Sequence, residues 1–330
     1  MRVRVMCSIA AVAACGTLVF GQGQSARHHL NPVIDLLEQK QPVFGLYRPS
    51  AGGNRGRGAA AESAPARQKT PIELAMETLA NGHSDFVFDG SMEGGVDRGL
   101  PAVTEYMKAM AEAGAVRTEP FPRLPHPVIL KIPKIAPDYA QAVDNISREL
   151  NVGSSGIMFV ETESAEEVRR GLAAMRFKSH GGTRPDNVGQ AAAYWGMSAQ
   201  EYRQKADLWP LNPDGELLNW TIVESKEGLA HVREIAAVKG IGVLWPGAGT
   251  LRGVFTTTNA AGERVFDAAG WEGAIQQVLA ACKEFNVPCG YPATANDIEM
   301  RMKQGFSVFV MQWGDAGAKA IEIGRAAAKR

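Results

Sequence analysis

Residues 220–251 read WTIVESKEGLAHVREIAAVKGIGVLWPGAGTL and contain one complete strand–helix–strand unit. The apolar run Trp220–Val223 predicts a buried strand, and Gly240–Trp245 predicts the next one. Apolar side chains between the two runs recur at helical spacing, at Leu229, Val232 and Ile235. Because consecutive parallel strands need a crossover connection that is usually a helix, this unit predicts an α/β fold built on a parallel sheet.

The same alternation of strands and helices extends from residue 43 to the end of the chain. Eight apolar strands are predicted, nearly all followed by a helix, at residues 43–47, 85–89, 128–132, 156–160, 220–223, 240–245, 287–291 and 306–311. Capping patterns at Thr70–Glu73 and Ser164–Glu167 mark the starts of two of the helices. Eight repeats favour a closed (β/α)8 TIM barrel. The alternative is a doubly wound open sheet, but no glycine-rich phosphate loop follows the first strand.

The start of the chain has the pattern of an export signal. Arg2 and Arg4 are followed by an apolar stretch from Val5 to Phe20 and then by polar residues, which predicts a signal peptide over residues 1–21. A periplasmic or secreted protein is expected, with no membrane contact beyond this signal. A lipid anchor at Cys15, which follows Val-Ala-Ala, is the alternative.

The rest of the chain is predicted to form an N-terminal tail and helix over residues 22–42 and the barrel over residues 43–330. Residues 50–69 lack large apolar side chains, so we expect a flexible loop there. Residues 177–218 are longer than an ordinary connection and rich in aromatic residues. We interpret them as an insertion on the functional rim of the barrel.

Charge and cysteine content narrow the possible functions. Lys+Arg and Asp+Glu both number 35, so the net charge is zero, which argues against a nucleic-acid-binding protein. Two of the four cysteines lie in the predicted signal peptide, and the other two, Cys282 and Cys289, have neither metal-ligand nor redox spacing. We expect two buried thiols, with a disulfide as the alternative in an oxidising compartment.

Acidic residues follow three of the predicted strands, at Asp89, Glu161 and Glu224. In a barrel of this kind the functional residues lie at the carboxyl ends of the strands. A single acidic residue there can equally cap the next helix. Three of them favour a carboxylate cluster that holds a hard divalent cation.

Several segments resemble the HpcH/HpaI aldolase and citrate lyase family. They are Asp89-Gly90, Gly156–Arg176, the strand ending in Glu224, the Gly240–Leu251 segment and Val287–Gly305. The resemblance implies a TIM barrel of the phosphoenolpyruvate/pyruvate-binding type that forms a homo-oligomer. It also implies Mg2+, Mn2+ or Co2+ as a Lewis acid that stabilises the enolate of a 2-oxo acid.

The resemblance assigns roles to individual residues, although four positions depart from the family pattern. Expected metal ligands are Glu224, which matches the family's glutamate, and Thr250, which stands where the family has an aspartate. Glu161 is expected as a further ligand in a rebuilt site because it follows a strand, not because the family has a ligand there. Expected catalytic residues are Lys131, in place of the family's arginine, Asp89 and Arg184. Gly247, Ala248, Gly249 and Trp245 are expected to contact the substrate, and Met92 replaces the family's histidine.

These residues predict a metal-dependent carbon–carbon lyase that acts on a small 2-oxo or hydroxy acid carboxylate through a pyruvate-type enolate. The alternative is an exported barrel that has lost aldolase activity and binds a small acid or a partner protein. A Schiff base at Lys131 is a third, weaker hypothesis. Asp89, Glu161 and Glu224 facing one cavity would favour the enzyme. A cavity filled by Met92 and tryptophan side chains would favour the binding protein.

Overall fold

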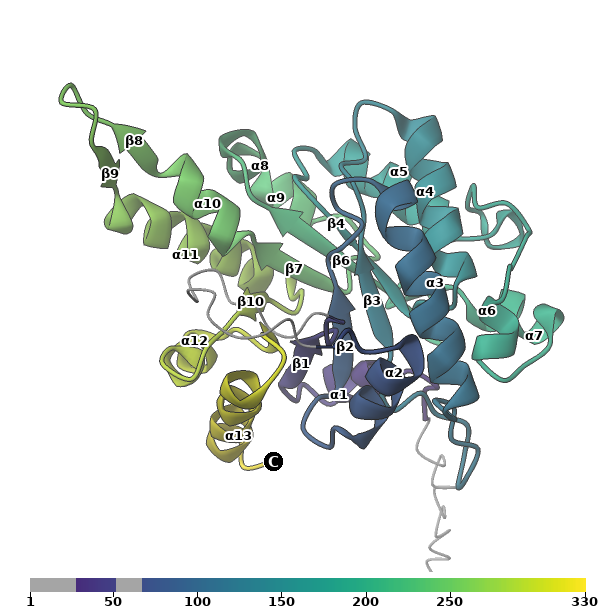
Figure 1. Ribbon diagram of the computed structural model, residues 1–330. Helices are drawn as coiled ribbons and strands as arrows, with labels where there is room; N and C mark the ends of the chain where they lie inside the picture. Colours follow the sequence, from purple (N-terminus) through teal and green to yellow (C-terminus); the bar gives the residue numbers. More distant parts are fainter. Residues whose placement is uncertain (1–27, 52–66) are drawn as a thin grey trace, which may run out of the picture.

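The computed structural model describes residues 28–51 and 67–330 (Figure 1). The predicted signal peptide and most of the predicted loop at 50–69 therefore lie outside the described residues. All eight predicted strands are present, as β1 (Val43–Tyr47), β2 (Phe86–Asp89), β3 (Val128–Lys131), β4 (Gly156–Phe159), β6 (Leu217–Val223), β7 (Val243–Pro246), β10 (Gly290–Pro292) and β11 (Val308–Met311).

These strands form one parallel sheet. Its order is β10-β11-β1-β2-β3-β4-β6, with β7 on the far side of β6, and the short β5 (Leu208–Trp209) also pairs with β6. An isolated parallel bridge joins Leu244 in β7 to Cys289, which directly precedes β10, and the Leu244 N–H donates to the Pro288 carbonyl at 2.9 Å. The chain is thus an α/β protein with a parallel sheet consistent with a TIM-barrel-like fold.

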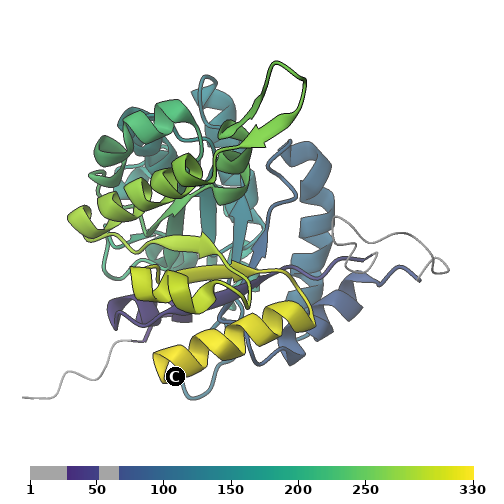
Figure 2. The same ribbon diagram turned by 90° about the vertical axis from the view of Figure 1, so that its left-hand side faces the viewer.

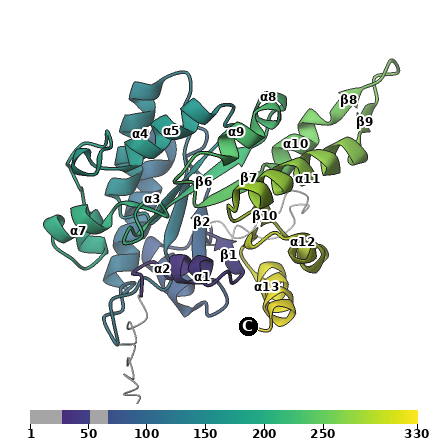
Figure 3. The same cartoon turned by 180° about the vertical axis from the view of Figure 1, so that it is seen from behind.

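Helices cover the outer face of this sheet. Figures 1 and 3 show α3, α4 and α5 on one side of the strands and α10 to α13 on the other. The larger helices are α2 (Pro71–Ala80), α3 (Val96–Glu112), α4 (Tyr139–Asn151), α5 (Ala165–Met175), α11 (Ala268–Phe285) and α13 (Asp315–Ala328). The shorter ones are α1 (Pro32–Glu38), α8 (Lys226–Ala230), α9 (Val232–Ala236), α10 (Ala248–Val254) and α12 (Ile298–Gln304).

Both predicted caps begin a helix, but only one forms the complete box. Thr70 and Glu73 satisfy each other's backbone N–H groups at the start of α2. Ser164 accepts the N–H of Glu167 at 3.2 Å, whereas the Glu167 side chain accepts the N–H of Glu163 at 3.0 Å. Each arrangement satisfies donors that a helix start would otherwise leave unpaired.

Alternate residues of the strands pack into two separate apolar clusters. The outer cluster contains Phe44 and Val87 and packs under the helices, whereas the inner cluster contains Phe88 and Trp220. This is the period-two pattern of a sheet buried on both faces. Helix α1 adds Val33, Ile34 and Leu37 to the inner cluster.

Aromatic rings fill much of the inner cluster. The Trp220 ring lies 4.9 Å from both the Phe86 and the Trp245 ring centroids, and 6.0 Å from that of Phe88. Gly290 makes room for this packing, because a Cβ at that position would overlap the Trp245 ring. Each large side chain buried in this way contributes about 1.5–3 kcal/mol of transfer free energy.

The insertion at 177–218 lies at the opposite end of the strands from the expected rim. It contains η1 (Lys178–His180), α6 (Ala191–Tyr194), α7 (Ala199–Lys205) and β5. Trp195 Nε1 donates to the carbonyl of Gly153, just after α4, at 2.9 Å. The insertion follows a helix and leads into a strand, so it returns to the amino ends of the strands, and the predicted rim position is wrong.

Two further features differ from the main prediction or add to it. Cys282 and Cys289 form a disulfide between α11 and the residue before β10, so the expectation of two buried thiols is wrong and the alternative of a disulfide is confirmed. An antiparallel hairpin of β8 (Thr256–Thr258) and β9 (Arg264–Phe266) follows α10 and projects from the body of the molecule (Figure 2). Within the described ranges, no helix has the length and apolar character that a membrane span requires.

Candidate functional site

Two adjoining cavities open at the carboxyl ends of the strands. The first, of about 190 Å3, is lined by Tyr47, Phe88, Lys131, Met158, Ile222, Glu224, Trp245, Pro246, Gly247, Ala248, Gly249, Thr250, Pro292 and Val310. The second, of about 300 Å3, is lined by Tyr47, Arg48, Pro49, Ser50, Phe88, Asp89, Gly90, Ser91, Glu93 and Lys131. We call them the glutamate cavity and the arginine cavity. Tyr47, Phe88 and Lys131 contribute to both.

Glu224 is the one carboxylate in the lining of the glutamate cavity. It follows β6 directly and is only 3% exposed. Its Oε1 accepts the backbone N–H of Glu161 at 3.0 Å. Its Oε2 lies against Gly247, where a Cβ would come within 2.5 Å of that oxygen. The carboxylate is therefore held from two sides, and glycine at 247 is needed for this close approach.

Lys131 lies on the wall between the two cavities, at the end of β3. Its Nζ donates to Glu93 Oε1 at 2.7 Å, and the lysine side chain is 14% exposed while that of Glu93 is 42% exposed. This ion pair holds Nζ against a carboxylate, whereas a Schiff base requires that nitrogen to be free to attack a substrate carbonyl. Burial, followed by the charge of Glu93, raises the pKa of the neighbouring Tyr47, so that phenol is neutral at physiological pH.

Asp89 and Arg48 form an ion pair in the arginine cavity. The Arg48 Nε donates to Asp89 Oδ2, and Asp89 Oδ1 accepts the N–H of Ser91 at 2.7 Å. The Arg48 guanidinium also lies 5.1 Å from the Tyr106 ring centroid. With both oxygens engaged, Asp89 is suited to position Arg48 rather than to accept a proton. Arg48 was not among the predicted site residues, although its place directly after a strand was a usable signal.

Thr250 and the predicted substrate-contacting residues gather where expected. Thr250, Gly247, Ala248 and Gly249 lie at the start of α10 and line the glutamate cavity. Trp245, near the end of β7, also lines this cavity and is 3% exposed. The strand order brings these residues to Glu224 because β7 is the neighbour of β6.

Three predicted or substituted positions lie outside both cavities. Glu161 is exposed, has a φ of +46° and offers its backbone N–H to Glu224 instead of a carboxylate ligand. Arg184 is fully buried in the insertion, where it donates to Asn151 Oδ1 at 2.9 Å, so its predicted catalytic role is wrong. Met92 is fully buried in the outer cluster and fills neither cavity.

The glutamate cavity fits a divalent cation only with help from other ligands. From the residues that the structure describes, its lining offers one carboxylate, that of Glu224, and two neutral hydroxyls, those of Thr250 and Tyr47. Among the described residues, no group of three potential metal-ligating side chains occurs at this end of the strands. Mg2+ in proteins is commonly held by one or two carboxylates together with waters and substrate oxygens. The donor set is therefore compatible with an ion that a chelating substrate helps to hold.

Comparisons with known proteins found a curated relative and solved structures of similar fold, whereas no family model matches the sequence. A curated relative, hydroxypyruvate/pyruvate aldolase of Paraburkholderia phytofirmans, is 25% identical over 224 residues, which are 67% of this chain and 69% of the relative.

Solved structures share the fold. An HpcH/HpaI aldolase/citrate lyase family protein of Burkholderia cenocepacia superposes with a TM-score of 0.61 at 21% identity, covering 91% of this chain and 98% of that one. HpcH/HpaI aldolase of Desulfitobacterium hafniense gives 0.57 at 16% identity, with coverages of 89% and 95%. Macrophomate synthase gives 0.56 at 18% identity, with coverages of 91% and 89%. The predicted resemblance is thus confirmed: in fold, and more distantly in sequence, this chain is similar to the HpcH/HpaI aldolase and citrate lyase family.

Proposed function

We propose that this protein is an aldolase-type carbon–carbon lyase that acts on a 2-oxo or hydroxy acid through a pyruvate-type enolate. The observation that carries the proposal is the placement of Glu224, Thr250 and Lys131 around one cavity at the carboxyl ends of parallel strands. The curated relative is a pyruvate aldolase, which supports the same class of reaction. The alternative of a binding protein is not favoured, because Met92 lies outside the cavity and Glu224, Thr250 and Lys131 line it.

We also propose that the eight strands close into a (β/α)8 barrel. The bridge between Leu244 and Cys289 supports closure, since it joins the two ends of the strand order. Closure would surround the inner aromatic cluster with strands on all sides and leave the cavities as its open end. Export through residues 1–21 and self-association stay predictions.

The residues of the glutamate cavity have different proposed roles that follow from their charge. Glu224 and Thr250 would hold a divalent cation, which when bound supplies Lewis-acid stabilisation of the enolate. The Lys131 ammonium, released from Glu93, would bind the carboxylate of the substrate. Trp245 and Ile222 add apolar surface to the same cavity and would exclude water from it. The lower local dielectric would strengthen both the contact of Glu224 with the cation and that of Lys131 with the substrate carboxylate.

The arginine cavity adds a second cationic group next to Lys131. Arg48 is 18% exposed, and its Nε is occupied by Asp89. Its terminal nitrogens offer the two-pronged geometry that a carboxylate prefers and that Lys131 lacks. We therefore assign Arg48 to binding the part of the substrate that extends from the glutamate cavity.

Hydrogen exchange at the methyl group of pyruvate tests this proposal without knowledge of the aldehyde partner. In D2O, the wild-type protein with Mn2+ or Mg2+ should replace these hydrogens with deuterium, as followed by NMR or mass spectrometry. Glu224→Gln should slow the exchange by about 100-fold or more, because it removes the anionic ligand. Glu161→Gln is the matched control and should leave the rate within about 3-fold, since only its backbone N–H contacts the site.

Two outcomes would count against an enzyme. Wild-type protein that binds pyruvate by calorimetry but catalyses no exchange with either Mn2+ or Mg2+ would favour the binding protein. Equal rates for wild type and Glu224→Gln would remove the glutamate cavity from the reaction.

A further inference from the structure

A second group of ionisable side chains lies at the amino ends of the strands, far from the two cavities along the strand direction. It contains His29, Asp35, Glu38 and Glu216, which we call the basal cluster. Asp35 and Glu38 lie on α1, His29 precedes this helix, and Glu216 directly precedes β6. His29, Asp35 and Glu216 are 1%, 6% and 3% exposed, and Glu38 is 36% exposed.

The imidazole of His29 faces carboxylates on two sides. Its Nδ1 lies 3.4 Å from Glu216 Oε1 and its Nε2 lies 3.6 Å from Glu38 Oε1. Both distances exceed those of ordinary hydrogen bonds, and neither ring nitrogen has a hydrogen-bond partner among residues 28–51 and 67–330. The His29 side chain is 99% buried, and burying two ring nitrogens without hydrogen bonds costs folding free energy. This cost indicates that a further atom or ion binds next to the ring.

Charge balance points to a cation. The three carboxylates carry three negative charges, and Arg123, at 3.3 Å from Asp35 Oδ2, contributes one positive charge. With a neutral imidazole the cluster is left with two negative charges, which one divalent ion would cancel.

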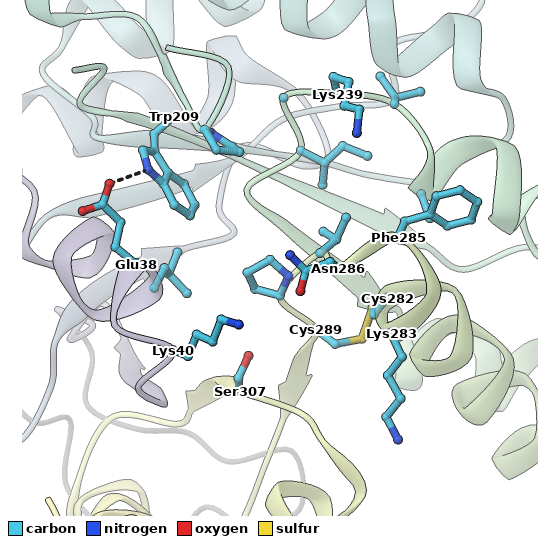
Figure 4. Close-up of a pocket in the computed structure, with 18 of the residues that line it drawn as sticks. Glu38, Lys40, Trp209, Lys239, Cys282, Lys283, Phe285, Asn286, Cys289 and Ser307 are labelled. Atoms are coloured by element: carbon cyan, nitrogen blue, oxygen red, sulfur yellow. Dashed lines mark hydrogen bonds between the residues drawn. A yellow bond between two sulfur atoms is a disulfide. The ribbon is translucent and has the colours of Figure 1, made fainter. Parts of the chain in front are cut away.

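The side chains are already held in place by neighbouring groups. Asp35 Oδ1 accepts the backbone N–H of His29 at 2.9 Å, and Glu216 Oε2 accepts that of Asn31 at 2.9 Å. Glu38 Oε1 accepts from Trp209 Nε1 at 3.2 Å (Figure 4). Because these side chains are already fixed, metal binding would cost little conformational entropy.

The cluster also has a route to solvent. Glu38 and Trp209 line a cavity of about 670 Å3 at the amino ends of the strands, together with Lys40 and the Cys282–Cys289 disulfide (Figure 4). An ion can therefore reach Glu38 from the cavity while His29 and Asp35 remain buried behind it.

We propose that His29, Asp35 and Glu38 bind one divalent transition-metal ion of the zinc class. One ligand atom from each residue lies within 4.8 Å of the others, and a nitrogen with two carboxylate oxygens is a donor set that Zn2+ accepts. Glu216 would orient the His29 ring without binding the ion, because it faces the ring nitrogen Nδ1 that the metal does not use. The ion would tie the segment before α1 to the base of the sheet. This site does not depend on the proposed lyase function.

Equilibrium dialysis of the full chain against Zn2+, with the metal quantified by atomic emission, tests the proposal. The Glu224→Gln protein serves as the background, so that the glutamate cavity cannot supply the signal. We expect one bound Zn2+ per chain. Adding Glu38→Gln or His29→Asn should weaken binding by at least about 10-fold. His231→Gln is the matched control, because that histidine pairs with Glu227 on another helix, and it should bind Zn2+ unchanged.

The arms of this experiment separate the possible outcomes. No bound Zn2+ in the background protein, or equal binding in the Glu38→Gln protein, would overturn the basal site. Glu38 is partly exposed, so its variant should fold even where His29→Asn does not. Zn2+ that is lost with Glu224→Gln but kept with Glu38→Gln would assign the ion to the glutamate cavity and also overturn the proposal.

Discussion

The two ends of the strand bundle use charge in opposite ways. At the carboxyl ends, Glu224, Lys131 and Arg48 line cavities, so their charges can meet a substrate. At the amino ends, His29 and Glu216 are almost fully buried and face each other. The first arrangement leaves interaction energy for a substrate to use, and the second leaves it for the proposed metal ion, which would stabilise the folded chain.

The inner aromatic cluster separates these two ends. The rings of Phe86, Trp220 and Trp245 pack against one another in the interior between them, edge-to-face for Phe86 and Trp220 and tilted for Trp220 and Trp245. Close-packed side chains of this kind leave no path for water or ions. Substitutions at one end should therefore change activity and those at the other should change stability, and each prediction below tests that division.

The largest effect is expected at Lys131. Lys131→Met keeps the length of the side chain but removes the charge that would bind the substrate carboxylate, so kcat/KM for pyruvate exchange should fall by about 100-fold, equivalent to about 2.7 kcal/mol. Lys131→Arg should recover part of this loss. Denaturant midpoints of both variants should match that of the wild type. A Lys131→Met protein that is fully active would remove the lysine from substrate binding.

At the amino ends, Glu216→Gln should change stability instead. In metal-free protein it removes the charge that faces His29 and weakens the hydrogen bond to Asn31, so the free energy of unfolding should fall by about 1–3 kcal/mol, measured by urea titration. The rate of pyruvate exchange should stay at the wild-type value. The exposed pair of Glu227 and His231 is the control, and Glu227→Gln should leave stability almost unchanged. Loss of activity without loss of stability would contradict the division between the ends.

Thr250→Asp sharpens the interpretation of the glutamate cavity. A second carboxylate beside Glu224 should tighten Mn2+ binding by about 10-fold, because affinity for hard cations rises with the number of charged ligands. Calorimetry without substrate measures this effect. Thr250→Asn, similar in shape but uncharged, is the control. Unchanged affinity in the aspartate variant would show that residue 250 does not reach the ion.

The smallest effect is expected at Glu149, on the outer side of the sheet. This residue is fully buried, and in the described part of the chain neither of its carboxylate oxygens has a hydrogen-bond partner. Burial, followed by repulsion from Asp89, raises the pKa of Glu149 well above its ordinary value of 4.5, against a weaker attraction to Arg148. The folded state therefore binds a proton that the unfolded state releases, so stability falls as pH rises from 4.5 towards the raised pKa.

Glu149→Gln should remove this pH dependence. At pH 8 the variant should be more stable than the wild type by about 1 kcal/mol, and the difference should shrink towards pH 4.5. Urea titrations at several pH values measure the trend. A difference that grows as pH falls would have the wrong sign and would contradict a protonated Glu149.

The sequence predicted those site residues whose position depends only on the end of their own strand. Glu224, Lys131 and Trp245 each end or follow an apolar strand, and parallel strands bring their carboxyl ends to one edge. Glu161 met the same criterion but failed, because its backbone turns to positive φ and its side chain leaves the cavity. Arg184 failed because the insertion that carries it connects a helix to a strand and so lies at the amino ends.

By itself, then, the sequence determined the strands, their parallel arrangement and the resemblance to an aldolase family, since these depend on periodicity and short motifs. Only the tertiary structure decided that Arg48 pairs with Asp89, that the two cavities share Lys131, and that Cys282 reaches Cys289. It alone brought His29 to Glu216, 187 positions further along the chain. Contacts of this kind depend on how the strands pack across the interior, and no local pattern of residues encodes that distance.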